Sequence, residues 1–208
     1  MKGLAISGTA LISAVVLVAT TTHVSNGAPP VRGILAAPVG RSVTPDLPAA
    51  PAFARAMLPA GTSLPVPVLG IDRHTISDSW GDARDNGQRQ HHGTDIMAPG
   101  GSVVIAAAPG RVEKLAQSGA GGTTIYIRST DGQWSFYYAH LMAYAPGLYE
   151  GQLVNAGDPI GYVGDTGNAG AGNYHLHFGV SYMQPGDRWW QGQPVDPYPL
   201  LADKAVGR

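Results

Sequence analysis

Two clusters of polar residues in this 208-residue chain have the residue types and the spacing to do chemistry. In the first, His91 and Asp95 stand four residues apart around Gly93, in a stretch whose Gly and Pro residues favour a loop that runs into a strand. In the second, His175 and His177 lie two residues apart, so on a strand both point to the same face. Each cluster alone is also compatible with a polar surface turn or hydrogen-bonded histidines. Together they indicate a metal site built from imidazole and carboxylate groups.

A third candidate, His140, ends a segment that alternates in the manner of a strand. The even positions of this segment share one face, and they are Trp134, Phe136, Tyr138 and His140. The alternation therefore predicts that His140 closes an aromatic face. In the segment 175–182 the same alternation places Leu176, Phe178 and Val180 opposite the two histidines, on the face expected to join the core.

The composition excludes several other chemistries. The chain has no cysteine, which removes disulfides, thiolate zinc sites and thiol nucleophiles. Its only glutamates, Glu113 and Glu150, do not neighbour a histidine, so the helical H-E-x-x-H zinc site is absent. Serine acyl-transfer motifs of the G-x-S-x-G and S-x-x-K types are absent too. A net charge of −1 argues against nucleic acid as a partner, because each neutralised phosphate needs a cation.

Short β-strands separated by glycine-rich turns are the elements expected to position these residues, since 29 of the 208 residues are Gly. The predicted strands span residues 66–71, 102–107, 111–115, 123–128, 133–140, 159–163 and 175–182. Asp131-Gly132 is expected to supply the two positive-φ residues of a two-residue hairpin turn. The predicted fold is mainly β, an antiparallel sheet or sandwich with long Gly-rich loops and little helix.

The residues before this domain have a different character. Residues 1–27 are predicted to be a signal peptide, because a lysine precedes an apolar run at 10–19; an uncleaved anchor is the alternative. Residues 28–61, rich in Pro and Ala, are expected to form a linker or pro-segment. The folded domain is predicted over 62–202, with a tail at 203–208. The protein is therefore expected to be exported, and to be periplasmic or secreted and associated with the cell wall.

Taken in order, four short segments resemble the lysostaphin-like (LytM-type) family of zinc peptidases. The family pattern is H-x-x-x-D, then A-P-x-G, then Y-A-H-L, then H-x-H, and the matching segments here are His91-His92-Gly93-Thr94-Asp95, Ala98-Pro99-Gly100-Gly101, Tyr138-Ala139-His140-Leu141 and His175-Leu176-His177. Further likeness lies in residues 151–161, 164–168 and 194–197. The resemblance covers residues 68–201 and implies a LytM/lysostaphin-like fold of the duplicated-hybrid-motif type.

The resemblance also implies roles for five residues. One zinc ion (Zn2+) per chain would be held by His91, Asp95 and His177, which leaves a fourth position for water. His175 would take the proton of that water as general base. His140 would stabilise the developing oxyanion or orient the water. The composition agrees with a histidine base, because no glutamate lies in these segments.

The activity implied by the resemblance is that of a zinc metalloendopeptidase that cuts peptide bonds in peptidoglycan stem peptides or cross-bridges. A peptidoglycan peptide is the implied partner, and neither nucleic acid nor, if the signal is cleaved, a stable membrane partner is expected; the chain is expected to be a monomer. The alternative is a non-catalytic, zinc-binding regulator of other cell-wall hydrolases. A biotinyl or lipoyl carrier, suggested by the glycine spacing of 151–161, would need a lysine that is missing between residues 115 and 203.

Glycine-rich loops are expected to form the walls of a narrow groove for this peptide, and they span residues 116–122, 143–151, 164–172 and 184–193. In the last loop, Trp189 and Trp190 either contact peptide or glycan or pack within the loop. His92, at a variable position of the first motif, either faces solvent or contacts substrate. His74 is given no role.

Overall fold

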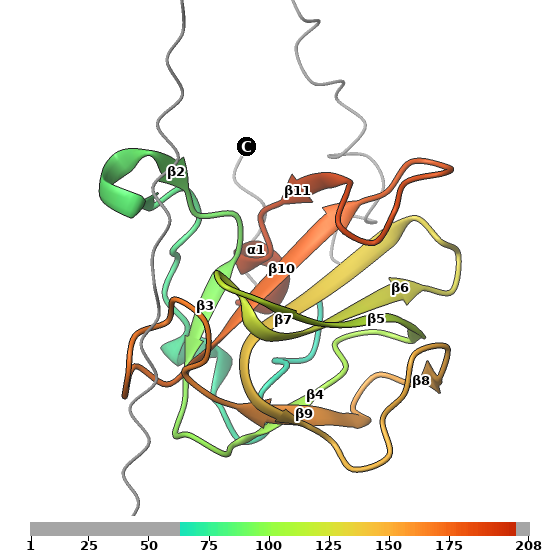
Figure 1. Cartoon of the computed structure of the whole chain (residues 1–208), viewed down its shortest axis with the longest axis horizontal. Helices are drawn as coiled ribbons and strands as arrows, with labels where there is room; N and C mark the ends of the chain where they lie inside the picture. The colour runs from blue at the N-terminus through green and yellow to red at the C-terminus, as the bar shows by residue number, and fades with distance from the viewer. Residues whose placement is uncertain (1–62, 203–208) are drawn as a thin grey trace, which may run out of the picture. The chain divides into compact units, whose positions relative to one another are not determined.

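Figure 1 shows a computed structural model of the chain. The structure describes residues 63–202. The predicted signal peptide, the linker or pro-segment and the C-terminal tail lie outside the described residues, so those assignments stay predictions. Within the described range, no helix is long and apolar enough to cross a lipid bilayer.

Residues 63–202 contain eleven β-strands, a single four-residue α-helix and two 3-10 turns. The strands are β1 (Ala83–Arg84), β2 (Arg89–Gln90), β3 (Thr94–Met97), β4 (Val103–Ile105), β5 (Gly110–Ser118), β6 (Gly122–Ser129), β7 (Trp134–Tyr144), β8 (Leu153–Val154), β9 (Pro159–Val163), β10 (His175–Tyr182) and β11 (Gln193–Val195). The helix is α1 (Tyr198–Leu201), and the 3-10 turns are η2 (Arg73–Thr75) and η3 (Asp85–Gly87). The prediction of a mainly β fold with little helix is confirmed.

Nine of these strands form one antiparallel sheet, and β1 and β2 form a separate hairpin. The main path runs β11-β10-β7-β6-β5-β8. Strand β10 also pairs with β3, on the edge opposite β7. Strand β7 is long enough to pair with β6 and β10 first and with β9 through its last residues, which connects the β4–β9 pair to the main strands (Figure 1).

The core lies on one face of the central strands. Side chains that alternate along β6, β7 and β10 are buried on this face, among them Ile125, Ile127, Trp134, Phe136, Tyr138, Leu176, Phe178 and Val180. The rings of Phe136 and Phe178 stack across β7 and β10 with centroids 6.5 Å apart. Each such side chain contributes about 1.5–3 kcal/mol on burial. The predicted inward face of 175–182 is confirmed, and the opposite face of the same strands is left for His175 and His177.

Most predicted strands are confirmed, two of them to the residue. Residues 159–163 and 175–182 are β9 and β10, and β5 and β6 extend beyond their predicted ranges at both ends. β7 runs over 134–144 where 133–140 was predicted, and β4 covers only 103–105 of the predicted 102–107. The prediction of a strand at 66–71 is wrong, because only an isolated bridge joins Val68 to Val104. Pro65 and Pro67 flank this stretch and cannot donate to a strand ladder.

The predicted two-residue turn between β6 and β7 is also wrong. Of the Asp131-Gly132 pair only Gly132 has a positive φ, of 77°. The Gly132 amide donates to the Ser129 carbonyl at 2.9 Å, and the Asp131 carboxylate accepts from the Gln133 amide at 3.0 Å. Hydrogen bonding by the aspartate side chain stabilises a longer turn in which the aspartate keeps an ordinary backbone conformation.

The predicted orientation of His140 is wrong as well, for a reason local to β7. His140 has a φ of 62°, and the register between β6 and β7 shifts at this point. Such a β-bulge re-aims a side chain, and a left-handed backbone in a non-glycine residue costs about 1–3 kcal/mol. The His140 ring therefore leaves the aromatic face and lies with centroid 4.8 Å from the ring of His175, on the other face of the sheet.

Candidate metal centre

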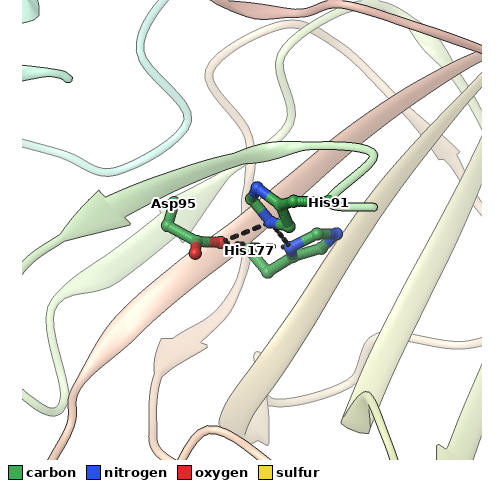
Figure 2. A group of neighbouring side chains, drawn as sticks. All are labelled: His91, Asp95 and His177. Atoms are coloured by element: carbon green, nitrogen blue, oxygen red, sulfur yellow. Dashed lines mark hydrogen bonds and ion pairs between the residues drawn. The ribbon is translucent and has the colours of Figure 1, made fainter. Parts of the chain in front are cut away.

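Strand pairing brings His91, Asp95 and His177 together from two distant parts of the chain. His91 directly follows β2, Asp95 lies in β3, and His177 lies opposite Asp95 in the antiparallel β3–β10 pair. Figure 2 shows the two imidazoles and the carboxylate converging on one another. These three residues form the candidate metal group found among the described residues, with their ligand atoms all within 4.8 Å of one another.

The donor set fits a catalytic zinc ion. His91 Nε2 and Asp95 Oδ1 are 3.0 Å apart, His177 Nδ1 and Asp95 Oδ1 are 3.1 Å apart, and the two nitrogens are 2.8 Å apart. Tetrahedral ligands with bonds of about 2.0–2.2 Å to zinc lie about 3.3 Å from one another. Two imidazole nitrogens and one carboxylate oxygen also match the three-ligand sets that leave a coordination position open.

Neighbouring groups orient two of these candidate ligands. The Ser79 carbonyl accepts from His91 Nδ1 at 2.6 Å, which leaves the lone pair on Nε2, the atom that faces the cluster. The Ser79 hydroxyl accepts from the Asp95 amide at 3.0 Å. Arg84 forms an ion pair with Asp95 Oδ2, so that Oδ1 is the oxygen left facing the imidazoles. Neither Ser79 nor Arg84 was predicted.

The protonation states suit metal binding. Burial alone would raise the pKa of the Asp95 carboxyl, but hydrogen bonds and charge from His177 and His91 outweigh it and hold that pKa well below its usual range. Burial lowers the pKa of His177, although the Asp95 carboxylate opposes the shift. An ionised carboxylate beside a neutral imidazole is the state in which both groups bind metals.

Gly93, between the two candidate ligands of the first motif, is at a position where only a residue without a side chain fits. A Cβ atom at this position would lie 2.6 Å from His177 Cε1 and 2.8 Å from the Phe178 carbonyl oxygen. Contacts that short do not occur, so any side chain here would displace β10 or the His177 ring. The glycine lets β3 approach β10 closely enough for the ligands to meet.

His175 and His140 lie beside this group. His175 Nε2 is 3.9 Å from Asp95 Oδ1, and its Nδ1 donates to the Asn173 carbonyl at 2.8 Å. His140 Nδ1 donates to the Thr166 carbonyl at 2.8 Å, and its ring centroid is 6.0 Å from that of His177. Burial lowers the pKa of His140 to about 4, against the raising effect of the Thr166 carbonyl. All five predicted site residues therefore converge in one place.

An open cavity of about 260 Å³ exposes this cluster to solvent. Its lining includes His91, Asp95, His140, His175 and His177, together with Tyr137 of β7. Residues 120–121 and 168–169 also line it, as expected for the loops 116–122 and 164–172. No lining residue comes from the loops 143–151 and 184–193, so these two do not wall the cavity.

The two other histidines within the described residues are both exposed. His92 is exposed and its ring lies 5.3 Å from that of Trp80, centroid to centroid. His74 is exposed in η2, where its amide donates to Asp72 Oδ1. Neither residue lines the cavity.

Comparison with known sequences agrees with the resemblance seen in the four sequence motifs. The sequence model of Peptidase family M23 matches residues 89–197. The chain is 39% identical over 134 residues to the L-Ala–D-Glu endopeptidase of Bacillus subtilis, which covers 62% of this chain and 40% of the relative. It is 32% identical over 100 residues to the peptidoglycan DD-endopeptidase ShyC of Vibrio cholerae, covering 48% of this chain and 22% of that protein. The chain thus spans less than half the length of these relatives.

Comparison with solved structures points the same way. The fold is similar to the catalytic domain of the antimicrobial peptidase lysostaphin from Staphylococcus simulans, with a TM-score of 0.51 and 27% sequence identity. The match covers 62% of this chain and 92% of the lysostaphin domain. The likeness therefore covers nearly all of a peptidase domain.

Proposed function

The chain belongs to peptidase family M23, and from this premise we propose that it is a zinc endopeptidase that hydrolyses peptide bonds in the stem peptides or cross-bridges of peptidoglycan. The family match and the likeness to lysostaphin confirm the resemblance seen in the sequence. The observation that carries the proposal is the convergence of His91, Asp95 and His177 beside two further histidines at an open cavity. Such an enzyme acts outside the cytoplasm, where its substrate lies.

Three residues would hold the zinc ion, namely His91, Asp95 and His177. The ion supplies Lewis-acid chemistry, which polarises a scissile carbonyl and lowers the pKa of water to near neutrality. No cysteine is needed for this ligand set, in agreement with the composition. Arg84 and Ser79 keep the carboxylate and the His91 ring aimed at the ion.

His175 is the proposed general base. Its Nδ1 proton is held by the Asn173 carbonyl, so the lone pair of the neutral ring lies on Nε2. That nitrogen is 3.9 Å from Asp95 Oδ1, at the edge of the proposed ligand group, which supports this role. It can take the proton of the water and later give it to the leaving amine.

His140 is proposed to orient the attacking water. Its Nδ1 also donates to a backbone carbonyl, that of Thr166, and its lowered pKa keeps the ring neutral near pH 7. In this state Nε2 accepts a hydrogen bond and does not donate one. The geometry therefore favours the water-orienting role over donation to an oxyanion, which would need a protonated Nε2.

The test joins metal analysis to digestion of purified peptidoglycans that differ in cross-link chemistry, with new amine termini identified by mass spectrometry. We expect His177→Ala to lose zinc and activity together. His175→Ala should retain zinc and lose about 10²–10⁴-fold in kcat, the usual size of a general acid-base contribution. His140→Ala should also retain zinc and lose activity, because the attacking water is no longer oriented. His92→Ala, which changes an exposed histidine away from the cavity, is the matched control and should keep both.

If the purified protein binds one equivalent of zinc but produces no new amine termini from any of the peptidoglycans, the endopeptidase proposal is overturned and the non-catalytic regulator is favoured. Full activity in either His175→Ala or His140→Ala would overturn the role proposed for that residue. New termini that name the residue on each side of the cut would identify the bond.

A further inference from the structure

A continuous line of aromatic rings runs from the metal centre across the site face of the sheet. The ring centroids of His177 and Tyr137 are 5.7 Å apart, those of Tyr137 and Tyr126 are 4.6 Å apart, and Trp189 follows at 4.8 Å from Tyr126. Trp190 lies a further 5.0 Å from Trp189. We call the four rings of Tyr137, Tyr126, Trp189 and Trp190 the aromatic shelf.

Strand pairing and loop contacts hold the shelf in place. Tyr126 and Tyr137 are direct partners in the β6–β7 ladder. The loop between β10 and β11 (Figure 1) carries both tryptophans. Arg128 of β6 binds this loop by donating to the Asp187 carbonyl at 3.3 Å. Arg128 is itself fixed by two hydrogen bonds to Glu113, of 2.8 and 3.0 Å. The rings are therefore pre-organised, which lowers the entropic cost of binding to them.

Trp190 is not a core residue, so core packing does not account for a tryptophan at this position. It is 52% exposed, and the Arg188 guanidinium lies 5.2 Å from its ring centroid. The exposed half of the indole forgoes part of the roughly 2 kcal/mol that burial of such a side chain contributes, and the ring ends a contiguous row of aromatic rings that begins at the cavity, which is typical of a binding surface. Tyr126, Tyr137 and Trp189 are half-buried and present the remainder of the surface.

The aromatic shelf begins at the cavity that contains the metal ligands, since Tyr137 lines that cavity. Extended peptide advances about 3.3–3.6 Å per residue, so the four ring-to-ring steps correspond to at most about six residues. A group attached to the substrate a few residues from the cut bond would thus reach the tryptophans.

Of the two parts of peptidoglycan, the sugars suit this surface better than the peptide does. A hexose ring offers a flat face of C–H groups of the size of an indole, with polar groups around its edge. Cross-link peptides have small side chains, which leave little to pack against four large rings. Tyrosine and tryptophan are suited to such mixed surfaces, because each joins a large apolar face to one polar group.

We propose that the aromatic shelf binds sugar rings of the glycan strand while the attached peptide occupies the cavity. This inference rests on the proposed function, because it takes the substrate to be peptidoglycan. The enzyme would then recognise glycan-linked peptides better than free ones.

Binding and cleavage can be measured separately on the full chain. Binding is followed by titration with soluble, peptide-free glycan fragments, and we expect Trp190→Ala to weaken it on the order of tenfold. Trp190→Phe should restore most of the affinity, since the aromatic face is kept. Tyr149→Ala removes another exposed aromatic residue, 62% exposed and on the loop between β7 and β8, and should change nothing. Unchanged melting temperatures would show that the variants fold.

Cleavage distinguishes sugar recognition from peptide recognition. Trp190→Ala should lower kcat/KM on glycan-bearing peptidoglycan by a similar factor and leave kcat/KM on a sugar-free peptide unchanged. An equal loss on both substrates would mean that the shelf binds peptide, and it would overturn the proposal. Equal glycan affinity of wild type and Trp190→Ala would overturn it too. If the wild type cleaves neither substrate, the proposed function fails, while the glycan titration still decides the role of the shelf.

Discussion

Three histidines of the site make the same kind of hydrogen bond through Nδ1. His91, His140 and His175 each donate from Nδ1 to a backbone carbonyl, and these carbonyls belong to Ser79, Thr166 and Asn173. A ring held in this way has its proton fixed on one nitrogen and its lone pair on the other. Backbone carbonyls thus set the tautomer, and no extra acidic residue is needed around the cluster.

Asp95 is oriented differently, by the guanidinium of Arg84. We predict that Arg84→Gln weakens zinc binding about 10- to 100-fold, the range found when partners of metal ligands are removed. The physical reason is that Asp95 Oδ2 loses its ion pair, so the carboxylate can rotate away from the imidazoles. Competition for zinc with a chromophoric chelator measures the effect independently of activity.

Two variants sharpen this prediction. Arg84→Lys retains the charge and should recover part of the zinc affinity. Arg111→Gln removes an exposed arginine of β5 that binds the Gly151 carbonyl, and it should leave zinc affinity unchanged. A dissociation constant for Arg84→Gln within twofold of wild type would show that Asp95 needs no such support.

The residues of the site could be found from the sequence where spacing carried the information. The spacings of His91 with Asp95 and of His175 with His177 marked two candidate clusters. Only the resemblance to the zinc peptidases assigned a role to each residue within them. Arg84 gave no such signal, because its contact with Asp95 depends on how the β1–β2 hairpin lies. The orientation of His140 was unpredictable by alternation, since a positive φ inverts it at one residue.

At the level of elements, Thr166 joins the segments that hold His140. Its hydroxyl accepts from the Thr123 amide at 3.0 Å and donates to the Leu141 carbonyl at 2.9 Å. Its carbonyl accepts from His140, so one residue ties the loop after β9 to both β6 and β7. Gly122 makes this approach possible, because a Cβ there would overlap Thr166.

We predict that Thr166→Val retains zinc but lowers kcat about tenfold, with little change in KM. The valine has the same shape and lacks the hydroxyl, so two hydrogen bonds that hold the loop against β6 and β7 are lost and the His140 ring is less well placed. The unpaired amide and carbonyl should cost about 1–3 kcal/mol of unfolding free energy. Steady-state kinetics, zinc content and urea unfolding measure the three quantities.

The matched variants for Thr166 distinguish the effect of losing its hydroxyl group from the effect of changing its side-chain shape. Thr166→Ser keeps the hydroxyl and should retain most of the wild-type kcat. Thr130→Val makes the same change at an exposed position in the β6–β7 turn, where we expect neither rate nor stability to change. Wild-type kcat in Thr166→Val would mean that the β-bulge alone orients His140.

Element prediction succeeded where a run of β-type residues lies between clear turn signals and failed where strands were short. β9 and β10 could be bounded to the residue, because Gly, Asp, Asn and Pro residues lie on both sides of each segment. β1, β2 and β8 have two residues each, too few to show any period. Their pairing is set by tertiary contacts, and such short strands are beyond propensity arguments.

In the molecule as a whole, the proposed metal ligands depend on the completed sheet. His177 and Asp95 are 82 positions apart in sequence, and they meet only when β10 pairs with β3. Both ligands lie on the face of β10 and β3 that the core does not use, so the same pairing buries the core and assembles the site. An unfolded chain offers no such group of ligands, so zinc binding at the proposed site would be coupled to folding.

This coupling predicts that zinc raises the stability of the folded domain. At a free zinc concentration of 100 times the dissociation constant, the gain is about 2.7 kcal/mol. For a domain of this size that corresponds to a melting temperature higher by roughly 5–10 °C. Thermal unfolding of the full chain with zinc, and after removal of zinc by a chelator, measures the difference.

His177→Ala, which lacks one ligand, should unfold at nearly the same temperature in both conditions. A shift of equal size in wild type and His177→Ala would place the stabilising ion elsewhere, because a site built across β3 and β10 cannot retain its affinity once the β10 ligand is gone.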